Sequence, residues 1–298
     1  MELCSIKWNY SSLFRKLSSL RPRNSSQMPD HNVASSVSTA GEESATGTLG
    51  KAMALLELVV MAPEPLRFTE ILNIVGQPRG TVHRQLTHLL QEGLLELDAH
   101  QAYVPGVRLL KFAGKAWARN DFRSVAAPYL RELQAVTGES VHLGMLRDTE
   151  VIYLDKVEGS RAIRMHSQIG NASPVFCTGV GKAALATLEQ ERILQIVDNI
   201  QFRSFTASTI TNGEALLKEV NAIRARGFGF DLAEHEEGIH CVAAPILCTG
   251  HDFAAAVSVT GPAYRLTLEH LEKVAPVVCE IADKIATDIS VRISPSSR

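Results

Sequence analysis

Long apolar runs and paired cysteines are both missing from this sequence of 298 residues. No run approaches the roughly 20 apolar residues that span a bilayer, so a membrane anchor is excluded. The five cysteines form no CxxC pair, and an odd number scattered along the chain argues against a disulfide framework. We therefore predict a protein of the reducing cytoplasm with no membrane partner.

Net charge is almost absent as well, with 30 Lys and Arg against 32 Asp and Glu. The balance changes along the chain, because residues 49–120 hold eight basic and six acidic side chains, whereas residues 121–298 hold 17 and 22. A mildly basic segment joined to an acidic one is compatible with nucleic acid at one end only. The excess is too small to establish such a partner by itself.

The length allows two ordinary domains, preceded by a serine-rich segment. Residues 1–48 include eleven serines and lack apolar periodicity, which is typical of a disordered tail. They also lack the apolar core and cleavage site of a secretory signal, so export is not predicted. A wrongly assigned start codon is an alternative explanation for this segment.

Residues 49–106 show the pattern of a winged helix-turn-helix. The predicted helices cover residues 49–60, 68–75 and 79–92. The first is indicated by apolar residues at three- and four-residue spacing, namely Leu49, Met53, Leu56 and Val60. Gly76 suits the left-handed end of the second helix, and residues 94–105 predict a β-hairpin wing. A structural three-helix bundle is the alternative, which the wing disfavours.

The third helix is the one that enters the major groove in this motif. Arginine suits guanine, glutamine suits adenine, and threonine can contact a phosphate or a thymine methyl group. The expected DNA-binding residues are Arg79, Thr81, Val82, Arg84, Gln85 and His88. The side of this helix that is expected to face the core carries Val82, Leu86, Leu89 and Leu90. A solvated face is the alternative to DNA contact.

Residues 107–121 are predicted to form a linker helix, and residues 122–298 a second domain. The apolar stripe of the linker helix is interpreted as a contact with a second subunit and comprises Leu109, Leu110, Ala113 and Trp117. The second domain has predicted strands at 140–146, 151–154, 239–246 and 254–259, and predicted helices at 122–137, 179–188, 191–199, 211–226 and 267–293. This α+β pattern predicts an antiparallel sheet covered by helices on at least one face.

Two short motifs suggest chemistry that their spacing does not support. Gly179-Val180-Gly181-Lys182 is not a phosphate loop, because Phe176 and Ala183 stand where glycine and serine or threonine are needed. His235 and His240 are five residues apart, so one helix face could not present both to zinc. We predict no metal, cofactor or catalytic site. The glycines at 179 and 181 are compatible with an anion at a helix start or with close packing.

Five blocks occur in order along the chain: PRGTVHRQL (78–86), TGVGKAALA (178–186), GFGFD (227–231), EEGIHCVAAPI (236–246) and AAVSVTGP (255–262). Together they resemble the IclR family of bacterial transcription regulators over residues 49–295. The resemblance implies a winged helix-turn-helix, a linker helix and a GAF-like effector domain, assembled as a homodimer or homotetramer on double-stranded operator DNA. Gly80 departs from the pattern, since a small helix former is expected there.

The resemblance also implies an effector pocket in the second domain. In family members that bind small acids, the corresponding positions line the pocket, and here they are Gly179, Val180, Asp231, Cys241, Ser258 and Thr260. Ser258 and Thr260 are two apart on a predicted strand and share a face. Residues 139–144 and 163–170 look most like regulators of ketodeoxygluconate and related sugar acids. A sugar acid or a short keto acid is therefore expected as the effector.

The resulting hypothesis is a DNA-binding regulator, with repression favoured over activation, that responds to a small carboxylate. The competing hypothesis is an enzyme, such as a hydrolase that uses Cys241 and a histidine. No nucleophile elbow, cofactor loop or paired catalytic motif supports the enzyme.

Overall fold

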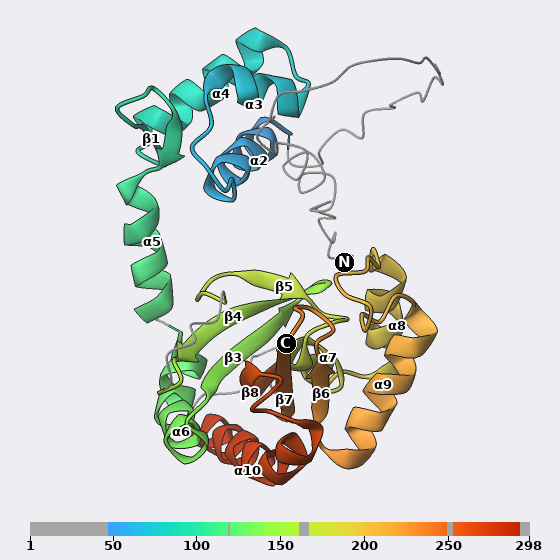
Figure 1. The fold of residues 1–298 in the computed structure, drawn as a ribbon. Helices are drawn as coiled ribbons and strands as arrows, with labels where there is room; N and C mark the ends of the chain where they lie inside the picture. Colours follow the sequence, from blue (N-terminus) through green and yellow to red (C-terminus); the bar gives the residue numbers. More distant parts are fainter. Residues whose placement is uncertain (1–46, 119, 161–166, 249–252, 293–298) are drawn as a thin grey trace, which may run out of the picture. The chain divides into compact units, whose positions relative to one another are not determined.

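The computed structural model describes residues 47–118, 120–160, 167–248 and 253–292 (Figure 1). Residues 1–46, which hold nearly all of the predicted tail, lie outside this part of the chain. The chain divides into two compact units between Trp117 and Ala118. No helix in the described ranges is long and apolar enough to cross a membrane.

The first unit consists of helices and one hairpin, in the order expected for a winged helix-turn-helix. Its elements are α2 (Gly47–Val60), α3 (Phe68–Val75), α4 (Arg79–Gln91), β1 (Leu95–Leu97), β2 (Tyr103–Pro105) and α5 (Val107–Ala118). α3 ends at Gly76, whose φ of 62° is left-handed as the sequence predicted. The hairpin tip is held by Asp98, whose carboxylate accepts the N–H groups of His100 and Ala102 at 2.8 and 2.9 Å.

Of the four residues that carried the periodicity of helix α2, only Leu56 is buried. Leu55 and Leu58 are buried in the core of the unit, whereas Leu49 is 71% exposed and Met53 is 41% exposed. The helix is apolar on several sides, so spacing alone does not identify the buried side. An exposed apolar stripe therefore runs along α2.

The second unit is an antiparallel six-stranded sheet with helices on both faces. Its elements are α6 (Asp121–Thr137), β3 (Ser140–Arg147), β4 (Glu150–Val157), β5 (Ala172–Pro174), α7 (Gly179–Leu185), α8 (Gln190–Asn199), α9 (Gly213–Arg226), β6 (Gly229–Leu232), β7 (Ile239–Ile246), β8 (Ala255–Pro262) and α10 (Leu268–Arg292). The strand order is β5-β4-β3-β8-β7-β6. The predicted strands and helices are present, and β5 and β6 were missed because three or four residues show too little alternation.

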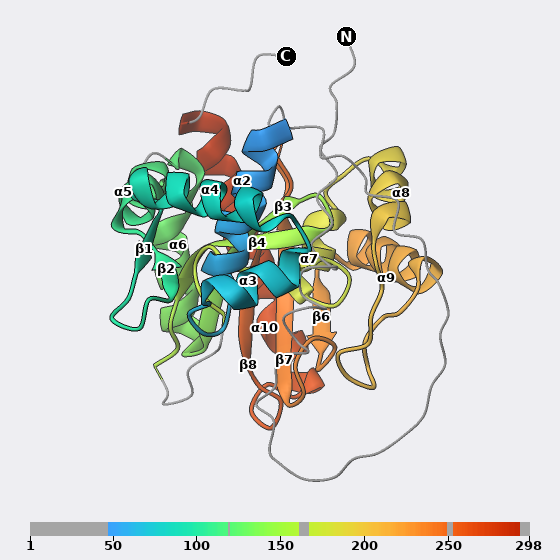
Figure 2. The same ribbon diagram turned by 90° about the horizontal axis from the view of Figure 1, so that it is seen from above.

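The two faces of the sheet carry different side chains. α6 and α10 cover one face, while α7 packs on the other face with α9 and α8 beyond it (Figures 1 and 2). On β3, Val141 and Leu143 belong to the core under α6 and α10. His142 and Gly144 alternate with them and therefore point to the α7 side. This second face is partly polar, and it contains the predicted effector residues.

Candidate functional site

Four of the six predicted DNA-binding residues lie at the surface of α4. Arg79, Arg84 and His88 are exposed, and Thr81 is half-buried. The Arg79 guanidinium lies 5.1 Å from the centre of the Phe68 ring, so the start of α4 contacts α3 through a cation–π interaction. The arginines and the wing thus belong to one winged helix-turn-helix unit.

Val82 and Gln85 require a correction, because both point into the core. Val82 is 0% exposed and Gln85 is 2% exposed, beside the buried Leu86 and Leu89. These positions follow the i, i+3, i+4, i+7 spacing of a single helix face. Gln85 Oε1 has no hydrogen-bond partner among the described residues, although it is buried. Neither side chain is placed to contact a base edge.

The strand register brings the predicted effector residues of the sheet together. Thr260 on β8 pairs with Cys241 on β7, and Cys241 pairs with Asp231 on β6. Residues that pair directly across antiparallel strands share a face, with Cβ atoms about 4.5–5.5 Å apart. Ser258 lies two residues before Thr260 and shares that face as predicted. All four residues are buried.

Helix α7 crosses the same face of the sheet, at a place where Gly144 has no side chain. A Cβ at Gly144 would lie 2.2 Å from Val180 Cγ1, and a Cβ at Gly179 would lie 2.8 Å from Cys241 Sγ. Gly181 is equally crowded, since its Cβ would lie 2.7 Å from the backbone of Val175. Close packing therefore explains these glycines, and it places Gly179 and Val180 beside the polar residues of the sheet.

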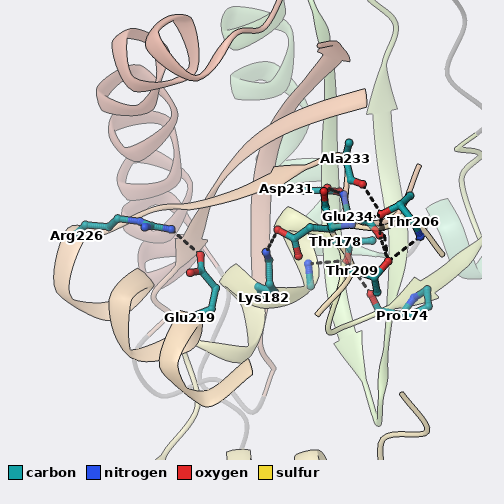
Figure 3. Close-up of polar contacts among 12 residues, drawn as sticks. Pro174, Thr178, Lys182, Thr206, Thr209, Glu219, Arg226, Asp231, Ala233 and Glu234 are labelled. Carbon is teal, nitrogen blue, oxygen red and sulfur yellow. Dashed lines mark hydrogen bonds and ion pairs between the residues drawn. The ribbon is translucent and has the colours of Figure 1, made fainter. Parts of the chain in front are cut away.

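The first turn of α7 is capped by Thr178. Its hydroxyl accepts the Gly181 N–H at 3.2 Å and donates to the Pro174 carbonyl at 2.9 Å (Figure 3). The N–H groups of Gly179 and Val180 precede the first helical hydrogen bonds, so no carbonyl of the helix can accept from them.

A buried charge cluster adjoins this face, and sequence reasoning missed it. Lys182 is 1% exposed and forms an ion pair with Glu234 (Figure 3). The Glu234 N–H donates to Asp231 Oδ1 at 2.7 Å. Burial raises the pKa of Asp231 to about 7 and also raises the pKa of Glu234, against the lowering effect of Lys182. Lys182 had been considered only as part of a phosphate loop.

A second loop is joined to the turn that carries Glu234. The Thr206 hydroxyl donates to the Ala233 carbonyl at 2.7 Å, and the Thr209 hydroxyl donates to the Glu234 carbonyl at 2.6 Å (Figure 3). These bonds connect the segment between α8 and α9 with the turn between β6 and β7. The turn that carries the ion pair is thereby held in place.

The geometry does not support Cys241 as a nucleophile. Burial, with the negative charge of Asp231, raises the pKa of Cys241 to about 12, although the hydroxyls of Thr260 and Ser258 lower it. The thiolate is the nucleophilic form of cysteine. At neutral pH the side chain is therefore a thiol, and the hydrolase hypothesis loses its nucleophile.

The two histidines considered for zinc face different surroundings. The His235 ring lies 5.0 Å from the Phe205 ring, and His240 Nδ1 lies 2.8 Å from the Leu266 carbonyl oxygen. Within the described ranges, no group of three or more His, Cys, Asp and Glu side chains could hold a metal ion.

His142 and Tyr153 are further polar residues on the α7 side that sequence reasoning did not assign to the site. His142 Nε2 lies 2.7 Å from Ser167 Oγ, and the His142 ring lies 5.3 Å from the Tyr153 ring. Burial, together with the charge of Lys156, lowers the pKa of His142 to about 3. The sequence did carry a signal for His142, because it is the one histidine among apolar residues in the predicted strand 140–146.

A winged helix-turn-helix with surface arginines, followed by a sheet domain with a buried polar face, defines a DNA-binding regulator that carries its own effector domain. The model of the IclR helix-turn-helix domain matches residues 48–99, and that of the bacterial transcriptional regulator IclR C-terminal domain matches residues 114–287. The chain belongs to the IclR family. It is a transcriptional regulator.

The named relatives align over most of this chain and over most of their own length. The regulator KipR of Bacillus subtilis is 33% identical over 242 residues, which are 80% of this chain and 96% of KipR. The regulator KdgR of Escherichia coli is 29% identical over 228 residues, 76% of this chain and 87% of KdgR. The crystal structure of Thermotoga maritima IclR has a TM-score of 0.63 at 30% identity and covers 82% of this chain and 98% of that one. The resemblance to the IclR family and to its KdgR-like branch is confirmed.

Proposed function

We propose that the protein is an effector-controlled repressor that binds a pseudo-palindromic operator. The observation that carries this proposal is the exposed polar face of α4, where Arg79, Arg84 and His88 are accessible next to the wing. Arginine at such a face can form two hydrogen bonds with guanine O6 and N7. Repression is favoured because it requires no contact with RNA polymerase. A protein bound to an operator can block the promoter by its position alone.

The proposed assembly is a homodimer or homotetramer. Two helices of the first unit carry exposed apolar side chains, namely Leu49, Met53 and Val60 on α2 and Val107, Leu110 and Phe112 on α5, and Met61 directly after α2 is exposed as well. Contiguous exposed apolar surface is typical of subunit contacts. Winged helix-turn-helix proteins also read two half-sites as symmetric pairs, which fits burial of these helices against a second copy.

The proposed effector is a small carboxylate that also carries hydroxyl groups. The N–H groups of Gly179 and Val180 suit the acid, and the hydroxyls of Ser258 and Thr260 suit polar groups of the ligand. Ser258 Oγ is buried without a hydrogen-bond partner among the described residues. The Asp231 carboxylate can accept a hydrogen bond from a ligand hydroxyl. A few convergent polar groups in an apolar setting are what a small-ligand site requires.

Replacing Arg84 by alanine is expected to weaken operator binding by about 1–3 kcal/mol, roughly 5- to 150-fold, because one base-edge contact is lost. Alanine keeps the helix, so the unit should still fold. The measurement is a mobility-shift titration with a duplex that the protein selects from a random pool. Arg192→Ala, at an exposed position of α8, is the matched control and should bind normally. Equal affinity of both variants would remove Arg84 from the interface.

Replacing Ser258 by alanine is expected to weaken binding of the acid with little destabilisation of the free protein, because the hydroxyl interacts only with the Cys241 sulfur, a weak hydrogen-bonding group. The measurement is a thermal-shift panel with gluconate, pyruvate, benzoate and glucose. An acid that binds should raise the melting temperature by mass action and should change operator affinity. Ser290→Ala, at an exposed position of α10, is the control. Stabilisation by glucose or benzoate alone would contradict the proposed effector class.

A further inference from the structure

The first turn of α5 is fastened to the end of α4 by an arginine. Arg108 Nη1 donates to the Glu92 carbonyl at 2.7 Å and forms an ion pair with the Glu92 carboxylate at 2.5 Å. Glu92 is the residue that closes α4. The last carbonyl groups of a helix have no partner within the helix, and they favour a cation. Arg108 therefore supplies both a hydrogen-bond donor and a positive charge to the end of α4.

Three more contacts fix the place where α5 starts. The Glu96 carboxylate on β1 accepts the Val107 N–H at 2.9 Å. Gly106 lies so close to the turn after α4 that a Cβ at this position would clash with the Gly93 carbonyl oxygen. Leu109 packs against the core of the first unit. The start of α5 is thus joined to the end of α4, to the wing and to the core.

The rest of α5 extends away from this attachment (Figure 1). Every residue from Leu110 to Ala116 is exposed, and Leu110 and Phe112 belong to the apolar surface proposed to contact a second copy. The Arg108 guanidinium lies 5.2 Å from the centre of the Phe112 ring, which is a cation–π contact. Arg108 thereby links the end of α4 to the part of α5 that carries the proposed subunit contact.

Small changes in the angle between α4 and α5 matter for a dimer. α5 has 12 residues and a length of about 18 Å. A tilt of about 10° at its first turn moves its far end by about 3 Å, close to the rise of about 3.4 Å per base pair. When two α5 helices are held together, the same tilt displaces each α4 from its half-site. The two half-sites of helix-turn-helix dimers lie about 34–36 Å apart.

The contacts of Arg108 can hold an angle without contributing much to stability. The side chains of Arg108 and Glu92 are 43% and 63% exposed, and ion pairs at such exposure stabilise proteins only weakly. The first unit should therefore fold without Arg108, because its core does not include this side chain. Loss of Arg108 should change the freedom of α5 more than the free energy of unfolding.

We propose that Arg108 and Glu96 form a clamp that sets the angle between α4 and α5 and thereby selects the half-site spacing that the dimer accepts. This inference rests on the proposed recognition of a pseudo-palindromic operator by two copies. Both residues are positioning residues, because they act through the orientation of α4 and need no contact with a base.

The test is a mobility-shift titration of the full chain with a duplex that the protein selects from a random pool. Further duplexes have the half-site spacing changed by one or two base pairs, and another has a single half-site. The parent should prefer the selected spacing at least tenfold. Arg108→Ala should reduce this preference at least threefold and leave the affinity for the single half-site unchanged.

Three further variants complete the series. Adding Glu96→Ala to Arg108→Ala should reduce the spacing preference further. Arg108→Lys keeps the charge without the planar guanidinium, so it should retain part of the preference, and it serves if the alanine variants do not fold. Lys111→Ala removes a cation at an exposed position of the same helix, and this matched control should behave as the parent does.

Three results would overturn the inference, and they are distinguishable. If Arg108→Ala and the double variant keep the spacing preference of the parent, the clamp does not set the spacing. If Arg108→Ala weakens the single half-site and every spaced duplex by the same factor, Arg108 acts within one DNA-binding unit only. If the parent itself prefers no spacing, the proposed recognition of the operator by two copies falls together with the clamp.

Discussion

Replacing Lys182 by methionine is expected to lower the free energy of unfolding by about 3–5 kcal/mol. The substitution removes a cation that is 1% exposed and leaves the Glu234 carboxylate buried without its ion-pair partner. Methionine has similar length, so lost packing contributes little. Burial already raises the pKa of Glu234, and loss of Lys182 raises it further. Glu234 can then take up a proton, so the loss should be largest at alkaline pH and smaller as pH falls.

Two further variants separate the buried charge from other effects of the substitution. Lys182→Met combined with Glu234→Met removes both charges, and it should recover most of the lost stability. Lys273→Met removes a lysine that pairs with Glu269 at the surface, where both side chains are more than half exposed, and should change little. Urea unfolding of the full chain at several pH values measures all three. An equal loss in the single and double variants would mean that packing, not charge, is responsible.

Replacing Asp231 by asparagine is expected to stabilise the protein increasingly as pH rises from about 4 to above 7. Burial raises the pKa of Asp231 in the folded protein to about 7, with the charge of Glu234 adding to the effect, whereas the unfolded value is about 3.9. Below pH 4 both states hold the proton. Between these pKa values the unfolded chain releases it first, so the parent loses stability with rising pH, by up to about 4 kcal/mol in total.

Asparagine cannot ionise, and its amide oxygen can still accept the Glu234 N–H that Asp231 Oδ1 accepts at 2.7 Å. The variant should therefore match the parent near pH 4 and exceed it above pH 7. Chemical denaturation at pH 4.5, 6, 7 and 8 measures the difference. Asp198→Asn, at an exposed position of α8, is the control and should follow the parent at every pH. If the difference in free energy of unfolding between the parent and Asp231→Asn did not change with pH, Asp231 would be ionised throughout this pH range.

Local physical chemistry determined much of the fold. The end of α3 at Gly76 follows from a left-handed backbone that glycine adopts without steric cost. The wing follows from two apolar runs around a polar turn. The long strands β7 and β8 follow from their apolar composition, and the placement of Ser258 and Thr260 on one face follows from strand alternation alone. Each of these features depends on residues close together in the chain.

Features that depend on packing between distant segments could only be decided by the tertiary structure. The core side of α4 takes Gln85 beside the apolar Val82, because the position of α2 and not the polarity of Gln85 decides which side is covered. Lys182 and Glu234 are 52 residues apart, and no local pattern links them. The pairing of His142 with Ser258 is set by the register of β3 against β8. A sequence determines which faces its elements have, whereas the register and packing of those elements determine which side chains meet.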